Sequence, residues 1–103
     1  MDGIGLNKLC IEVDGDEINF DEVMRKAADV IGCDVAKMEN ELYKAWINDD
    51  DFEFEFIYST DYGDFECRIV YTGTCIFVES DTKYACIEVT EIIEEIIRSF
   101  ITC

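Results

Sequence analysis

The spacing of the apolar residues changes at Asp51, and this change constrains the fold more than any other feature of the sequence. Between residues 20 and 46, apolar side chains recur every three or four positions, which is the period of an amphipathic helix. From residue 52 the period is two, so that Phe52, Phe54 and Phe56 point one way and the acids between them point the other. Helical and strand periods in separate stretches of one short chain favour an α+β fold.

Two helices are expected before the change of period. Asn19 is a typical N-cap, Glu22 three residues later completes a capping-box pattern, and Gly32 is a typical helix end. Asp34 follows almost directly as the N-cap of a second helix, so the connection between the two helices is short. The expected apolar faces are Phe20, Val23, Met24, Ala27, Ala28 and Ile31 in the first helix and Val35, Met38, Leu42, Ala45 and Trp46 in the second.

The strands are predicted from alternation and from turn residues. Residues 6–13 alternate between apolar and polar positions, which indicates a half-buried first strand. Residues 61–64, with the sequence Asp-Tyr-Gly-Asp, form a turn into a return strand that ends at Tyr71, so the two strands make a hairpin. Residues 75–78 are apolar on both faces, which is typical of a central or covered strand.

The C-terminal stretch permits two interpretations. Residues 84–89 fit either a further strand or the start of a helix, and we expect the long helix because the apolar stripe from Ala85 to Ile101 keeps its phase throughout. The 103-residue chain is then a single acidic α+β domain, residues 1–103, in the order β-αα-βββ-α. Its small antiparallel sheet has four strands, or five under the other interpretation, with the helices packed on one face.

The charge of the chain is unusual for a domain that also has enough apolar residues to fold. The sequence has 25 Asp and Glu against 8 Lys and Arg, a formal net charge of −17 at pH 7, although 50% of its residues are hydrophobic. Direct nucleic-acid binding requires a lysine and arginine footprint, and an anionic membrane repels acids, so we expect neither as a partner. A charge beyond what solubility requires favours a cationic protein partner.

The cysteines are expected to be reduced. The first residues have no basic segment followed by an apolar stretch, as a secretory signal would, and no apolar run is long enough to span a membrane. Free cysteine behaves as a small buried hydrophobe. We therefore expect a protein of the host-cell cytoplasm rather than a disulfide scaffold. The six cysteines are Cys10, Cys33, Cys67, Cys75, Cys86 and Cys103.

No combination of residues in the sequence predicts catalysis. The chain has no histidine, which removes Ser-His and Cys-His pairs, and no C-x-x-C spacing, so zinc, thiol-redox and iron–sulfur sites have no support. Residues 14–22 are similar to the second half of a calcium-binding EF-hand loop, but that loop would be one residue short and would lack its glycine. The acids of this stretch also have a simpler explanation, because the helix dipole favours negative charge near the N-terminus of a helix without any metal. We expect no enzyme, no cofactor and no metal, with calcium at residues 14–22 as the alternative.

The acids are concentrated in two runs, one with eight acids and no base between Asp49 and Glu66 and one with six acids and no base between Glu12 and Glu22. On a strand, alternate acids are about 6.7 Å apart, which is about two phosphate steps of one DNA strand. A hairpin would therefore present a line of carboxylates, and the last helix would add a second acidic surface. The residues expected to bind a partner are Asp49, Asp50, Asp51, Glu53, Glu55, Asp61, Asp64, Glu66, Glu91, Glu94 and Glu95.

In size, charge and mixed α/β build, the whole chain resembles the small acidic proteins of phages and mobile elements that mimic DNA, notably the anti-CRISPR proteins. The resemblance includes no motif, so it assigns no role to individual residues. It implies a stoichiometric inhibitor that occupies the DNA- or PAM-reading site of a CRISPR–Cas effector, where arginine and lysine contact DNA. The alternative is an immunity protein that neutralises a basic toxin nuclease. In both cases the partner is a basic nucleic-acid-binding protein.

Overall fold

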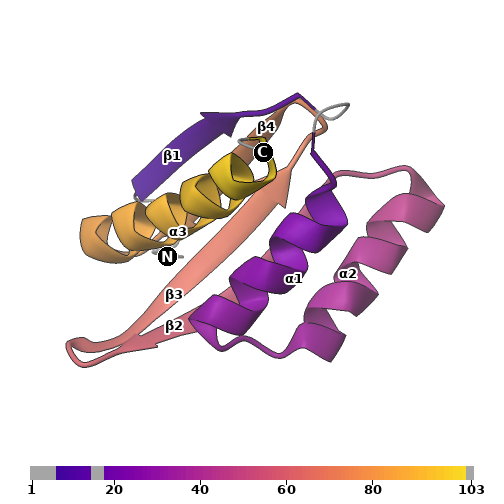
Figure 1. The fold of residues 1–103 in the computed structure, drawn as a ribbon. Helices are drawn as coiled ribbons and strands as arrows, with labels where there is room; N and C mark the ends of the chain where they lie inside the picture. The colour runs from indigo at the N-terminus through magenta and orange to yellow at the C-terminus, as the bar shows by residue number, and fades with distance from the viewer. Residues whose placement is uncertain (1–6, 15–17, 102–103) are drawn as a thin grey trace.

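The alternating segments pair into one antiparallel sheet, and the helices lie on one side of it (Figure 1). The computed structural model describes residues 7–14 and 18–101, and over these residues the order β-αα-βββ-α is as expected. The elements are β1 (Asn7–Glu12), α1 (Phe20–Ile31), α2 (Val35–Asn48), β2 (Phe52–Thr60), β3 (Gly63–Tyr71), β4 (Cys75–Ser80) and α3 (Lys83–Ile101).

The sheet has the strand order β1-β4-β3-β2, so β4 is internal and β1 and β2 are the two edges. The prediction of a central strand at residues 75–78 is therefore confirmed. β2 and β3 pair without interruption from Phe52 opposite Tyr71 to Thr60 opposite Gly63. The hairpin turn consists of two residues, and Gly63 after it has a φ of 132°, a backbone conformation that favours glycine.

The C-terminal segment is helical from Lys83 onward, so the five-stranded alternative for residues 84–89 is wrong. Val89 and Ile93 are completely buried, whereas Glu91 and Glu95 between and after them are exposed. The apolar stripe of α3 thus faces the sheet, where it contacts β1 and β4.

Both helix starts and the end of the first helix have the predicted caps. The Asn19 side chain accepts a hydrogen bond from the backbone N–H of Glu22 at 3.4 Å, and Asp34 accepts one from Lys37 at 3.2 Å. Gly32 has a φ of 90°, which a residue with a Cβ rarely adopts. Three residues therefore suffice to end α1, reverse the chain and begin α2.

The core lies between the sheet and the helices. The phenylalanines of β2 point into it, and Phe52 packs edge-on against Phe20 of α1 with ring centroids 5.4 Å apart. Phe20 also stacks on Tyr71 of β3 at 3.9 Å. Burial of an aromatic or aliphatic side chain of this size contributes about 1.5–3 kcal/mol. The inner positions of β2 are therefore fixed by packing, which leaves the acids at alternate positions on the outside.

The apolar face predicted for α2 is only partly buried. Met38 is completely buried, but Val35 is exposed and 80% of the Trp46 surface is accessible to solvent. α2 contacts α1 and the edge strand β2, and it lies at the margin of the sheet (Figure 1). Because a helix at the margin is covered on one narrow side only, the assignment of Trp46 to the core was wrong.

Several expected features lie outside the described residues. They are Leu6 at the start of the first strand, residues 15–17 within the calcium-loop-like stretch, and Cys103. Within the described ranges, no helix combines the length and apolarity that crossing a bilayer requires.

The caps provide a direct test of the helix assignment. Asn19→Ala removes the acceptor for the Glu22 N–H and should lower the free energy of unfolding by about 1 kcal/mol. Asn40→Ala is the control, because Asn40 is exposed inside α2, where alanine is the better helix former. Urea denaturation followed by circular dichroism measures both, and equal stabilities of the two variants would contradict the capping role.

Candidate functional site

The open face of the sheet carries a row of alternating charges. The strand registers place Lys8, Glu79, Arg68 and Glu55 side by side across β1, β4, β3 and β2. All four belong to the face opposite the helices, because the neighbouring positions in the middle of β2, β3 and β4 are buried in the core and Lys8 pairs with Glu79. The inner face of the sheet is apolar, and the open face carries this charged row beside apolar residues such as Phe77.

Arg68 lies at the centre of this row and contacts three acids. Its Nε is 2.7 Å from Oε2 of Glu79, and its Nη1 is 3.3 Å from Glu55 and 3.5 Å from Glu53. The hydrogen bond to Glu79 is the main reason that the pKa of Arg68 is raised, with the charges of Glu79, Glu53 and Glu55 adding to it. The expected line of Asp51, Glu53 and Glu55 is therefore partly neutralised from within the sheet. Glu53 and Glu55 are still 58% exposed, so they remain accessible to a partner.

Asp49, Asp50 and Asp51, which we call the acidic turn, connect α2 to β2. Asp49 caps α2 with a φ of 55°, the left-handed conformation, and its N–H donates to the carbonyl of Ala45. The N–H of Asp50 donates to the same carbonyl at 3.0 Å. All three side chains are exposed, and within residues 7–14 and 18–101 no ion pair neutralises them. The backbone thus holds three uncompensated carboxylates at one corner of the molecule.

Trp46 lies beside the acidic turn. It lines a hollow of about 470 Å³ together with the three aspartates, Phe52 and Tyr71, and Asp21 of α1 adds a further acid. Tyr43, one turn earlier on α2, is 60% exposed. Exposed aromatic faces next to carboxylates attract lysine and arginine, and tryptophan is often a dominant contact in protein interfaces. The exposure of Trp46 was not predicted, because its spacing also fits the apolar face of α2.

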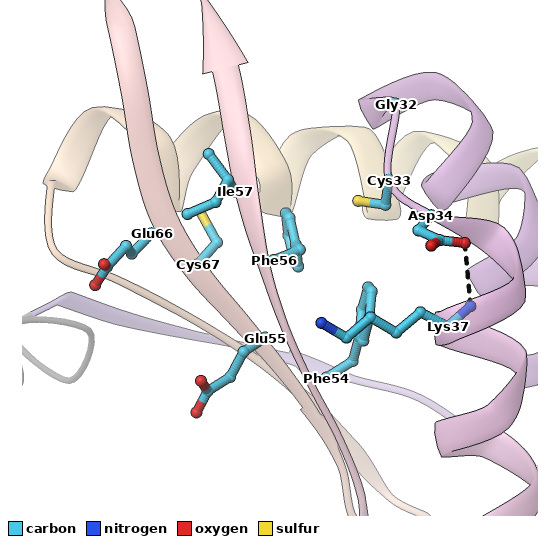
Figure 2. Close-up of a pocket in the computed structure, with 10 residues that line it drawn as sticks. All are labelled: Gly32, Cys33, Asp34, Lys37, Phe54, Glu55, Phe56, Ile57, Glu66 and Cys67. Carbon is cyan, nitrogen blue, oxygen red and sulfur yellow. Dashed lines mark hydrogen bonds between the residues drawn. The ribbon is translucent and has the colours of Figure 1, made fainter.

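A groove, which we call the edge groove, runs between α2 and the free edge of β2. Its first part, about 500 Å³, lies between the joint of α1 and α2 and residues 54–57 (Figure 2). Lys37 extends from α2 toward β2 there. The edge groove continues past Glu41 and Glu53 to Asp50 and Asp51, and this part consists of two hollows of about 390 and 170 Å³. The edge groove therefore joins the acidic turn to the middle of β2.

The remaining predicted acids do not join this surface as one patch. Asp61 and Asp64 lie at the hairpin tip, at the far end of a nine-residue strand and hence roughly 25–30 Å from the acidic turn. Glu66 lies between, and it lines the first part of the edge groove. Glu91, Glu94 and Glu95 are on α3, which lies on the same face of the sheet as α2 but over β1 and β4, away from β2 (Figure 1).

The cysteines within the described residues have no disulfide, and two of them line the edge groove. Burial raises the pKa of Cys33 and of Cys67 to about 11, so both thiols are protonated at neutral pH. Over the residues that the structure describes, no group of three Cys, Asp or Glu side chains is arranged to hold a metal ion. The surface carries exposed carboxylates and aromatic rings, and Lys37 and Lys44 line parts of the edge groove.

No family model matches the chain, and neither the curated proteins nor the solved structures include a significant match.

Arg68 can be tested as the organiser of the charged face. Arg68→Met leaves Glu79, whose side chain is only 13% exposed, without its strongest partner and should lower the free energy of unfolding by about 1–3 kcal/mol. Added salt should reduce this loss by screening the three carboxylates. Arg25→Met is the control, since its pair with Glu39 is half exposed and solvent screens it, so its loss should cost little. Similar losses in both variants would contradict a central role for Arg68.

The backbone of the acidic turn gives a second test. Asp49→Gly relieves a left-handed conformation and should raise the free energy of unfolding by about 0.5–1 kcal/mol. Asp50→Gly removes the same charge at a position without positive φ and should bring no such gain. Thermal denaturation of the two variants at equal ionic strength separates them, and an equal change in both would assign the effect to charge.

Proposed function

We propose that this protein is an inhibitor that binds the cationic nucleic-acid-binding surface of a defence nuclease, such as a CRISPR–Cas effector, and competes there with DNA. The observation that carries the proposal is the acidic strip formed by the acidic turn with Glu53 and Glu55 of β2, all exposed on one edge of a rigid sheet. A fixed array of carboxylates accelerates the encounter with a positively charged groove and repels partners that are themselves negatively charged.

The spacing of the strip supports mimicry of a phosphate backbone. Glu53 and Glu55 occupy alternate positions of β2, about 6.7 Å apart, which is about two phosphate steps, and Asp51 directly precedes the strand. Arg68 holds Glu53 and Glu55 to one guanidinium and thereby restricts both side chains. With Glu79 included, three carboxylates face the two cations Arg68 and Lys8, so this part of the strip keeps one net negative charge.

Trp46 supports a protein partner. Its exposed indole and the three aspartates line the same hollow, and this pairing suits the guanidinium of arginine, which combines charge with a flat face. Arginine and lysine are the residues with which nucleases contact DNA. We infer that partner cations enter this hollow first and extend along β2.

The test uses two variants that each lose three charges. Asp49→Asn, Asp50→Asn and Asp51→Asn together should weaken binding roughly tenfold, because exposed charges contribute about 0.5 kcal/mol each. The matched control replaces Glu91, Glu94 and Glu95 by Gln on α3, which should change binding little. Asparagine is chosen at residue 49 because it tolerates the left-handed conformation.

The measurement is capture from a lysate of the native host by the wild-type protein and by both variants, followed by mass spectrometry. A retained nuclease that duplex DNA and added salt displace, and that the aspartate variant fails to capture, supports the proposal. A retained toxin domain would favour an immunity protein, and equal capture by both variants would rule out the acidic strip.

A further inference from the structure

The outer edge of β2 is a free sheet edge. β2 pairs with β3 on one side, and no other described strand lies on its second side. In an antiparallel ladder alternate residues direct N–H and C=O toward the partner strand, and the two-residue turn makes Thr60 and Gly63 such a pair. Counting back by twos, the residues whose backbone groups point away from β3 are Glu53, Glu55, Ile57 and Ser59.

This edge lacks several of the usual protections against further pairing. Proteins shield edge strands with proline, bulges, short length, charged side chains or a covering helix or loop. β2 has nine residues, an uninterrupted register, no proline and phenylalanine at its inward positions. The other edge, β1, has six residues and carries Lys8. β2 is thus a template for an added strand, guarded mainly by its own acids.

The edge groove provides the space for such a strand. At residues 54–57 the facing wall includes Gly32, which has no side chain, and Lys37 of α2 extends into the space toward β2 (Figure 2). The groove follows β2 back to Asp50 and Asp51, so an extended segment can run its length to the acidic turn.

We propose that β2 binds an extended segment of its partner, with lysine or arginine at alternate positions, as a fifth strand of the sheet. This inference rests on the proposed function and specifies how the partner is engaged. The backbone of the segment pairs with Glu53, Glu55 and Ile57, and its basic side chains lie on the open face beside Glu53 and Glu55. Its intervening side chains point to the other side, toward Phe54 and Phe56, and are apolar.

A second copy of this chain is a poor occupant. Two β2 strands paired edge to edge would bring the glutamates of both copies onto one face, and each chain has a formal net charge of −17. The same charges attract a basic segment. Charge complementarity therefore selects a cationic partner strand over self-association.

The probe is a strand-length synthetic peptide of alternating lysine and valine. It should bind roughly tenfold more tightly than a peptide of the same composition with its lysines grouped at one end, and N-methylation of alternate amides should abolish the difference. Hydrogen exchange should slow at the amides of Glu53, Glu55 and Ile57 when the peptide is added. The amides of Phe54 and Phe56, already directed to β3, are internal controls.

A variant with unchanged charge completes the test. Ile57→Pro removes an outward N–H, at an edge position that tolerates proline, and keeps every carboxylate. It should lose roughly tenfold in affinity for the alternating peptide, whereas Ile57→Thr, which keeps the N–H, should bind like the wild type. Thermal denaturation verifies that both variants are folded.

Equal binding of the alternating and grouped peptides, or of the two Ile57 variants, would overturn the added-strand proposal. That failure is distinct from failure of the proposed function, which would appear as nuclease capture that survives loss of the three aspartate charges. The amides of Glu53, Glu55 and Ile57 could become protected by the peptide while the triple aspartate variant still captures the nuclease. That result would support strand pairing at β2 and would show that the acidic turn does not bind the nuclease.

Discussion

The alternation of phenylalanine and glutamate in β2 is the constraint on which the rest of the structure depends. Because side chains alternate strictly between the faces of a sheet, a slip of one residue would bury Glu53 and Glu55 and expose Phe54 and Phe56. The cost of burying unpaired carboxylates excludes that register. The same constraint that closes the core against α1 therefore places the acids in line on the outside, so fold and surface are determined together.

The charge that this arrangement concentrates has to be tolerated by a small core. Self-repulsion at a formal net charge of −17 opposes compaction, and the structure reduces it locally where carboxylates are most crowded. Arg68 lies between Glu53, Glu55 and Glu79 in the middle of the open face, whereas no ion pair among the described residues compensates the acidic turn. The uncompensated charge is thus found at a corner, where solvent screens it best and a partner reaches it most easily.

The sequence predicts the elements of this fold well because their signals are local. Asn19, Gly32 and Asp34 mark helix ends by hydrogen bonds or backbone angles within a few residues, and the period of two marks the strands. The features it missed depend on residues far apart in the chain. Trp46 has the spacing of a core residue, and only the position of α2 at the sheet margin exposes it. Likewise, the strand order brings Glu79 to Arg68, so the neutralisation of Glu53 and Glu55 could not be predicted.

An edge strand that is long, regular and free of proline is normally a hazard, because it pairs with any exposed strand. In β2 the hazard and the proposed recognition have the same physical source. Glutamates at alternate positions repel acidic or identical strands and attract basic ones, while the free backbone groups of the same residues are indifferent to sequence. Backbone pairing would then supply affinity and the carboxylates would supply selection. In this proposal Glu53 and Glu55 act from a strand, because only a regular strand keeps carboxylates and backbone groups in one register.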